Sequence, residues 1–537
     1  MRILQSRQLV WLVFIIILFM LLVNNGLTLW DQDEAAYAGF GKRMLETGDW
    51  LIPNYPWSDV HRKTPFHFWN IATMFSFFGV SEFTMRLSSV AYIWGTCLIL
   101  FFGLRKYLGA ETMLLAVVVL ASSFLVPSLA KIAVTDATLL FFSTLCALSI
   151  IKVLQDFRWY WVGVFWLSFA LALLTKGPPI IIFTGCMAIG VLIFYPKRWN
   201  LLKFHPWFGL PLACLPLYFW GKATVAVDDG VFISWMYDWY VLKRISGSVF
   251  GQTGPPGTHL LGIFGFFLPY LIFIPALIKD SIQSFKSKNE THFLVVLWFI
   301  TGWLIYEFSA SKLPAYVIVA HVPFAILIAR SMLNIAQRKT INVFQWKVVL
   351  TIFISLISAG ISVAPFLLDG LESLEQTAVW LGFGFEFICI VVIWGSDALQ
   401  LKNYALAWLL FQCVCWTIIY PKVDNLHNTT RLIAEDLYDQ ANSNSTIVIA
   451  NSSGRPPSLF YYLEQYFGQV REEKQADKLL DAYQSDTPTV LILSEKLTDK
   501  LDLNLVESDS ITYSAKLADR KDPVKYVILL NKAAQKD

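Results

Sequence analysis

Residues 9–37 read LVWLVFIIILFMLLVNNGLTLWDQDEAAY, and this stretch decides the class of fold. Its first part, residues 9–29, is mostly apolar and about as long as a helix that crosses a bilayer, which needs roughly 20 residues. It carries no small-residue cleavage site, so we expect an uncleaved membrane anchor. The run ends on Trp30 and the acidic group Asp31-Gln32-Asp33-Glu34, so charged side chains begin where the first span ends.

The composition extends this pattern over most of the chain. Of 537 residues, 56% are hydrophobic and only 15% are charged, whereas soluble proteins carry about 25% charged residues. The formal net charge of +3 is too close to balance to indicate a nucleic-acid partner. We therefore expect a membrane protein whose partners include membrane lipids and no nucleic acid.

Further apolar runs follow the first and predict a polytopic α-helical protein with about 13 transmembrane helices. They lie at 88–104, 112–130, 136–153, 159–174, 178–195, 207–223, 258–278, 292–309, 315–333, 346–366, 376–395 and 403–420. With the N-terminus in the cytoplasm, the inside loops hold most of the basic residues, while the short outside connections hold Lys131, Lys176 and Lys312. This asymmetry follows the positive-inside rule and supports both the odd number of spans and this orientation. We expect a multi-pass protein of the plasma (inner) membrane with its N-terminus in the cytoplasm.

The same topology places three long polar segments outside the membrane. They are the loops 30–87 and 224–257, which we expect to form the active-site face of a transmembrane domain 1–420, and the tail 421–537. The tail predicts a small extracytoplasmic soluble α/β domain. Its expected strands are Thr446–Ala450, Thr489–Leu493 and Tyr526–Leu530, and its expected helices are Pro457–Phe467 and Lys474–Ala482.

The acidic group after the first span has three interpretations. Adjacent carboxylates repel one another unless a cation or a donor-rich pocket stabilises them. Asp33 and Glu34 are therefore candidates for acid–base chemistry, and Asp31 with Asp33 for binding a divalent cation. The alternative is a solvated acidic cap on the following helix, expected over Glu34–Glu46, because carboxylates favour helix N-termini.

Cations gather at the same predicted face. Arg62 and Lys63 precede an aromatic run and suit a lipid phosphate, although ordinary interfacial snorkelling explains them too. Lys176 and Lys312 lie beside proline breaks, which at membrane depth need neighbouring protein or a wet cavity. The second loop combines Trp235, Trp239 and Lys243-Arg244. It is either a lid that grips a sugar or phosphate, or a helix lying in the interface.

The order of these features resembles the GT-C membrane glycosyltransferases, in particular the protein O-mannosyltransferase and lipid A aminoarabinose transferase family. The matching pieces are Asp33-Glu34 with Tyr37, Gly48-Asp49-Trp50 with Pro53, Lys63 with Pro65, Thr135-Asp136, Thr175-Lys176-Gly177-Pro178, and Ser311-Lys312-Leu313-Pro314 with Tyr316. Two departures stand out. This chain has Ala36 where the family often has Arg, and Arg62-Lys63-Thr64-Pro65 where the family commonly has Glu-Lys-Pro-Pro, so no cation-binding role of that Glu carries over.

The resemblance implies a GT-C fold and an inverting transfer of a hexosyl or pentosyl group from a polyprenyl phosphate, such as undecaprenyl phosphate, on the outer face. The acceptor is lipid A, a protein or another envelope glycan or lipid. Asp33 would activate or orient the acceptor, with support from Glu34. Lys63, Arg62 and Arg244 would hold the donor phosphate, and Tyr37, Asp136, Lys176, Lys312 and Tyr316 would line the cavity or position the acceptor. No cofactor is implied with certainty, and a divalent cation at Asp31 and Asp33 is an open alternative.

Two rival functions stay open at this point. A transporter or flippase of lipid-linked sugars, without chemistry, predicts charged or broken helices near the midplane and related halves. Here the polar residues gather at one face and no repeat is evident. A non-catalytic scaffold leaves the acidic group and the two cavity lysines unexplained.

Overall fold

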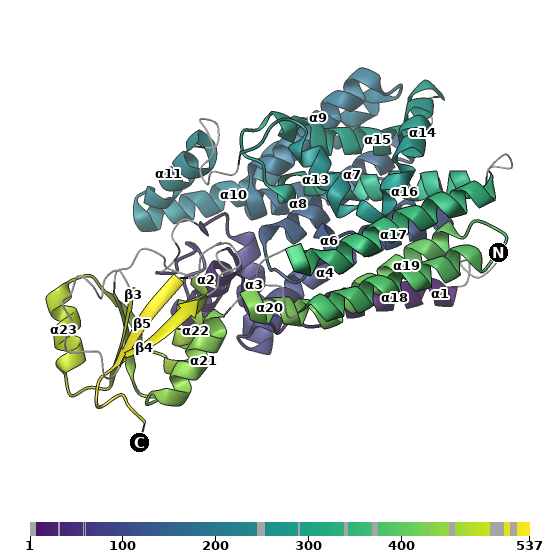
Figure 1. The fold of residues 1–537 in the computed structure, drawn as a ribbon. Helices are drawn as coiled ribbons and strands as arrows, with labels where there is room; N and C mark the ends of the chain where they lie inside the picture. The colour runs from purple at the N-terminus through teal and green to yellow at the C-terminus, as the bar shows by residue number, and fades with distance from the viewer. Residues whose placement is uncertain are drawn as a thin grey trace.

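The computed structural model describes residues 7–30, 33–56, 58, 61–243, 253–287, 290–337, 342–367, 374–427, 429–450, 457–494, 510–515 and 524–536. Over these residues the chain forms a long helical bundle with a small sheet at one end, and the first helix, α1 (Arg7–Leu22), begins near the opposite end of the bundle (Figure 1). Two short helices, α2 (Asp33–Thr47) and α3 (Phe66–Phe78), lie between the bundle and the sheet.

The helices of the bundle follow the apolar runs of the sequence. In the first half they are α1 (Arg7–Leu22), α4 (Glu82–Leu108), α5 (Ala110–Ala121), α6 (Leu125–Ser128), α7 (Thr135–Gln155), α8 (Trp159–Lys176), α9 (Pro178–Phe194), η3 (Arg198–Phe204), α10 (Pro206–Asp228), α11 (Val231–Tyr237) and η4 (Asp238–Leu242). In the second half they are α13 (Thr258–Phe266), η5 (Leu268–Phe273), α14 (Ile274–Ser287), α15 (Glu290–Trp303), η6 (Leu304–Phe308), η7 (Pro314–Val317), α16 (Ile318–Gln337), α17 (Val343–Leu367), α18 (Glu375–Trp394), α19 (Leu401–Val414), η9 (Cys415–Ile419) and α20 (Tyr420–His427).

This architecture confirms a multi-pass helical membrane protein. Among the described residues, 9 helices are long and apolar enough to cross a membrane, or 10 if one bent pair forms a single span. The helices α1, α5 and α9 are also apolar but shorter. The total of 13 spans therefore stays a prediction.

Some predicted spans differ in shape from a straight helix, among them the first span and the run 258–278. The helix α1 ends at Leu22 rather than near residue 29, because Asn24 adopts a left-handed conformation with φ of 59°. The carbonyls of Leu21 and Val23 then accept hydrogen bonds from the buried Lys131 ammonium instead of continuing the helix. The run 258–278 is broken after Phe266, where the chain bends by 101°.

The C-terminal part contains a mixed five-stranded sheet of order β2-β1-β3-β5-β4. Its strands are β1 (Thr446–Ala450), β2 (Val470–Glu473), β3 (Thr489–Ser494), β4 (Ser510–Ala515) and β5 (Val524–Leu530). The first three run parallel, with Ile447 opposite Val470 and Val490, and β5 pairs antiparallel with both β3 and β4. The helices α21 (Thr430–Gln440) and α22 (Pro457–Phe467) lie on one side of the sheet and α23 (Ala476–Gln484) on the other (Figure 1). The expected α/β fold is confirmed, although β2 and β4 were not predicted.

The sheet does not stand apart from the bundle. One hydrophobic core joins Tyr37 and Phe40 of α2 to Ile447 of β1 and Tyr462 of α22. At its edge, Glu464 of α22 lies 3.5 Å from the Lys42 ammonium of α2. The C-terminal part therefore packs directly on the first predicted outside loop, and the division of the chain at residue 420 stays a prediction.

Candidate active site

Asp33 is the first residue of α2 and is surrounded by hydroxyl and ammonium groups. The Tyr37 hydroxyl donates to Asp33 Oδ1 over 3.0 Å, one helical turn further on. Lys63 Nζ lies 3.5 Å from the same oxygen and also contacts the Tyr37 hydroxyl. The Asp33 side chain keeps 51% of its surface exposed, whereas the Lys63 side chain keeps 17%. The cluster thus presents a carboxylate that a ligand can reach.

The surrounding charges set the ionisation of this cluster. Removal from water raises the pKa of Asp33, but Lys63, His61 and the hydrogen bond from Tyr37 lower it more, to about 2. The pKa of the buried Tyr37 hydroxyl lies well above its ordinary value, because of burial and the neighbouring Asp33. Asp33 is therefore anionic and Tyr37 neutral at physiological pH.

A second ion pair lies at the ends of two spans. Asp136, in the first turn of α7, is 2.7 Å from Nζ of Lys176, the last residue of α8. The acidic group at a helix N-terminus and the basic group at a C-terminus both suit the helix dipoles. Lys176 Nζ also lies 5.9 Å from the centre of the Tyr316 ring. The structure thus brings together residues 136, 176 and 316, as the sequence predicts for one face.

The two ion pairs form a single electrostatic cluster. Lys176 contributes to lowering the pKa of Asp33, and Asp136 contributes to raising the pKa of Tyr37. Coulombic effects on a pKa grow as the separation between the charges falls. Three segments far apart in sequence therefore supply carboxylates and ammonium groups to one place.

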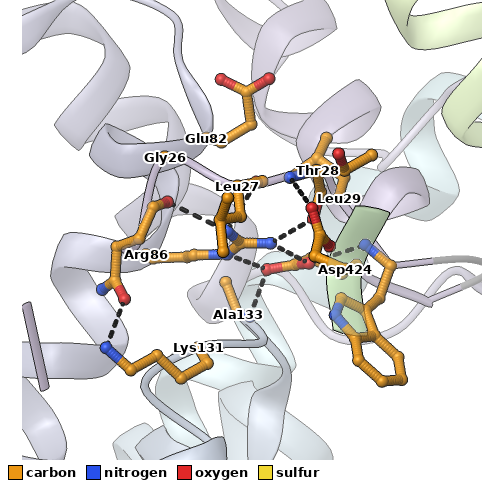
Figure 2. A network of polar contacts seen from close by, with 12 residues as sticks. Gly26, Leu27, Thr28, Leu29, Glu82, Arg86, Lys131, Ala133 and Asp424 are labelled. Carbon is orange, nitrogen blue, oxygen red and sulfur yellow. Dashed lines mark hydrogen bonds and ion pairs between the residues drawn. The ribbon is translucent and has the colours of Figure 1, made fainter. Parts of the chain in front are cut away.

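Glu34, the neighbour of Asp33, has a different environment, in the buried network around Arg86 (Figure 2). Its two oxygens accept from Arg86 Nε and Nη2, each over 2.8 Å, and neither side chain is exposed. The backbone amides of Trp30 and Ala133 donate to the same carboxylate. Glu34 therefore joins the loop after α1, the start of α4 and the loop before α7.

Arg86 completes this buried network. Its remaining N–H groups donate to the carbonyls of Asn25, Leu27 and Thr28, and the Thr28 amide donates to Asp424 of α20 (Figure 2). Because the guanidinium donates to three backbone carbonyls as well as to Glu34, the network holds the residues from which α2 begins. Arg86 was not recognised from the sequence. The feature that could have indicated it is a single basic residue just before the apolar run 88–104.

Residue Ala133 is fixed from two sides. Its amide donates to Glu34 Oε1 over 2.7 Å, and its carbonyl accepts from His67 Nε2 over 3.0 Å. Burial lowers the pKa of His67 to about 4, so the imidazole is neutral at physiological pH. Since Asp136 follows three residues later, Glu34 and His67 together position the loop that carries it. This role of His67 was not predicted from the sequence.

Arg62 links the two predicted outside loops. Its guanidinium lies 5.3 Å from the Phe232 ring and 4.9 Å from the Trp235 ring of α11. Within the same loop, Lys243 forms a 2.8 Å ion pair with Asp238, and Tyr240 raises the pKa of Tyr37. The second loop therefore approaches the Asp33 cluster. Arg244 lies outside the described residues, so its role as a phosphate ligand stays a prediction.

Lys312 lies in a neighbouring, fully internal group. Its Nζ is 3.6 Å from Glu307 Oε2 and donates to the carbonyl oxygens of Tyr306 and Glu307. Glu307 also accepts from the amides of Gly257 and Leu260. The structure thus gives Lys312 an acidic partner that the sequence analysis did not consider, and its role in lining the cavity stays a prediction.

The metal hypothesis has no support in the described ranges. Over these residues, no group of three or more His, Cys, Asp or Glu side chains is placed to hold a metal ion. Asp31 lies outside the described part of the chain, so a site shared by Asp31 and Asp33 stays a prediction.

Comparison with known proteins adds independent evidence. Residues 62–220 match the family described as dolichyl-phosphate-mannose-protein mannosyltransferase. An undecaprenyl phosphate-alpha-4-amino-4-deoxy-L-arabinose arabinosyl transferase of Shewanella sediminis is 24% identical over 413 residues, 73% of each chain. The crystal structure of ArnT from Cupriavidus metallidurans in the apo state superposes with a TM-score of 0.76 at 16% identity, over 98% of both chains. The same protein bound to undecaprenyl phosphate gives 0.75 over 99% of both chains.

These similarities and the cluster of carboxylates and ammonium groups define a membrane glycosyltransferase with the GT-C fold. Within that class, its similarities are to an aminoarabinose transferase and to the protein mannosyltransferase family. The resemblance stated from the sequence is thereby confirmed, and a transporter without chemistry is not favoured.

Proposed function

We propose that this protein transfers a sugar from a polyprenyl phosphate to an acceptor at the outer face of the membrane, with inversion at the anomeric carbon. The observation that carries the proposal is the reachable, anionic Asp33 held between Tyr37 and Lys63, with Asp136 and Lys176 beside it. The structural similarity to a protein bound to undecaprenyl phosphate and the relative's name support the donor class.

The reaction is a single displacement. An acceptor oxygen forms a bond to the anomeric carbon on the face opposite the phosphate, and the bond from that carbon to the phosphate oxygen breaks with its electron pair. Lys63 and Arg62 stabilise the departing phosphate by charge and hydrogen bonding. Asp136 and Lys176 position the acceptor and line the site with Tyr316.

The role of Asp33 depends on its contact with Lys63. While Lys63 lies beside it, the low pKa makes Asp33 a weak base suited to orienting an acceptor. When a donor phosphate draws the Lys63 ammonium towards itself, that stabilisation weakens and the pKa of Asp33 rises. Donor binding would thus strengthen the base for a hydroxyl acceptor, whose proton passes to Asp33. A phosphate acceptor is already anionic, and Asp33 would only orient it.

The orientation in the membrane is part of the same proposal. Basic residues predominate at the end of the bundle away from the sheet, where Arg7 begins α1 and Arg105 lies near the end of α4. The positive-inside rule assigns that end to the cytoplasm. The Asp33 cluster and the sheet then face the periplasm, or the extracytoplasmic side of an inner membrane.

The deciding experiment compares Asp33→Asn with the wild type in a purified transfer assay. The donors are undecaprenyl phosphates carrying aminoarabinose or mannose, tested with lipid A and with extracted envelope glycans. We expect turnover to fall by about 10³-fold, the range for loss of a positioned acid–base group, with an unchanged melting temperature. Glu46→Gln, an exposed acid on the same helix, is the matched control and should keep full activity.

Undiminished turnover of Asp33→Asn would overturn the assignment of this residue. Mass spectrometry of envelope lipids and glycans from a deletion strain identifies the sugar and the acceptor. Repeating the assay after chelation tests the divalent cation, which we expect to matter only if Asp31 completes a site with Asp33.

A further inference from the structure

The end of the bundle farthest from the Asp33 cluster contains a second site of a different kind. A cavity of about 640 Å³ lies there between α1, α4, α5 and α16. Its volume falls in the range of small-ligand sites, about 300–1,000 Å³. Figure 1 places the start of α1 at the opposite end of the bundle from the sheet, so this cavity has no part in the proposed transfer reaction.

The charge of the cavity is strongly positive. Arg7, Arg105 and Arg330 all line it, and the acid among its lining residues is Glu111. Glu111 is already neutralised, because it forms an ion pair with Lys402 of α19. Within the described residues, no carboxylate lies within ion-pair distance of Arg7 or Arg105, whereas Arg330 is attracted by Asp280. At least two guanidinium groups therefore remain available to an anion.

The backbone adds to this preference. Helix α5 begins at Ala110, after Gly109 with φ of +88°, and no side chain caps its first turn. The first amides of a helix have no partner within the helix and carry a partial positive charge. Gly109, Ala110 and Thr112 all line the cavity, so these donors lie beside the arginines.

Apolar side chains at the rim indicate what kind of anion fits. Trp11 of α1 and Phe102 of α4 line the cavity and keep 50% and 40% of their surfaces exposed. Their rings lie 6.0 Å apart, and the Arg105 guanidinium lies 4.8 Å from the Phe102 ring. On a transmembrane bundle such exposed rings face acyl chains. The site therefore combines a polar, cationic interior with a lipid-facing border.

A neighbouring cavity shows what distinguishes this one. It measures about 320 Å³ and is lined by Lys106, Lys152 and Arg158. There Asp156 already lies 3.6 Å from Lys106 and 3.9 Å from Arg158. An internal acid thus occupies the position that an external anion would take. In the described part of the chain, no acid forms such a pair with Arg7 or Arg105, and Glu111 is paired with Lys402.

We propose that the cavity between α1, α4, α5 and α16 binds the phosphate head group of an anionic phospholipid of the cytoplasmic leaflet. The phosphate lies between Arg7, Arg105 and Arg330, and the acyl chains run along Trp11 and Phe102. A bound lipid neutralises the arginines that converge here and fastens the membrane anchor α1 to the rest of the bundle. Basic groups near an anionic leaflet each contribute to such binding.

The test is native mass spectrometry of the full-length protein in detergent, titrated with phosphatidylglycerol or phosphatidylcholine. The variant is Arg7→Gln/Arg105→Gln, because both side chains lack ion-pair partners among the described residues and the protein should fold. The matched control is Arg158→Gln, at the same membrane end but paired with Asp156. We expect the double variant to lose phosphatidylglycerol affinity by about 30-fold, at about 1 kcal/mol per arginine. The control should bind like the wild type.

A second measurement distinguishes a lipid phosphate from free inorganic phosphate as the ligand. Inorganic phosphate at millimolar concentration should not displace the bound phosphatidylglycerol, and phosphatidylcholine should not distinguish the double variant from the wild type. Equal phosphatidylglycerol binding by the double variant and the wild type would overturn the proposal. Displacement by inorganic phosphate would also overturn it and would assign the cavity to a soluble anion.

Discussion

Asp33 and Glu34 are neighbours in the first turn of α2, but they belong to two regions of opposite character. Glu34 is fully buried and accepts hydrogen bonds from Arg86 and from two backbone amides. Asp33 is half exposed and is held by the side chains of Tyr37 and Lys63. The same type of carboxylate thus serves the fold at one position and is reachable by a ligand at the next.

The two carboxylates differ in whether their partners are fixed backbone groups or side chains that can turn. A buried ion pair recovers its desolvation cost only when its remaining donors and acceptors are paired, and Arg86 achieves this on three backbone carbonyls. The partners of Asp33 are side chains that can turn towards a ligand without breaking the backbone. The Glu34 network is therefore tied to the backbone, whereas the Asp33 cluster is held by side chains alone.

The largest effect is expected from breaking the Glu34 network. Arg86→Gln leaves the Glu34 carboxylate buried without its counter-ion, which costs about 3–5 kcal/mol. We expect a steep loss of monodisperse protein and a lower melting temperature. Lys197→Gln, which removes an exposed ion pair with Glu290, should cost less than about 1 kcal/mol. A stable Arg86→Gln protein that has lost only activity would erase the distinction between the two regions.

A smaller effect on the fold is expected at Asp136, which lies between the two regions. Asp136→Asn keeps the shape of the side chain but removes the charge that pairs with Lys176. We expect kcat/KM for the acceptor to fall by about 10²-fold, with KM for the donor changed much less. Steady-state kinetics with each substrate varied in turn, together with thermal unfolding, check this outcome. A loss of folded protein as severe as for Arg86→Gln would place Asp136 in the structural network instead.

The smallest effect concerns pH and His67, which fixes Ala133 opposite Glu34. Its pKa is lowered from 6.5 to about 4. Between pH 6.5 and pH 4, His67 is therefore protonated in the unfolded chain and neutral in the folded chain. Stability is therefore lost as pH falls from about 6.5 towards 4, by about 2 kcal/mol between pH 7 and 5. His67→Asn should flatten that part of the curve of melting temperature against pH. The exposed His205→Asn is the control and should leave the slope unchanged; equal slopes in both variants would contradict the assignment.

The sequence predicted most of what depends on composition and order. Apolar runs located the helices of the bundle, and short apolar runs in the tail located β1, β3 and β5. The predicted topology placed Asp33, Lys63, Asp136 and Lys176 on the same side of the membrane. It missed β2 and β4, because their short polar sequences Val470–Glu473 and Ser510–Ala515 lack the apolar content of central strands and lie at the edges of the sheet. It also extended the first span to residue 29. Hydropathy alone does not reveal that Lys131 donates hydrogen bonds to the carbonyls at the end of α1.

What the sequence determined by itself is a membrane body with a small α/β region and a set of charged residues at one predicted face. Only the tertiary structure decided how those charges pair. Arg86 lies 52 positions from Glu34 and was not among the candidate residues, and Lys312 pairs with Glu307 of the preceding η6. The physical reason is that hydropathy and charge asymmetry act on whole segments and fix which side of the membrane a residue reaches. Ion pairs act over a few ångströms, so they depend on how the segments pack.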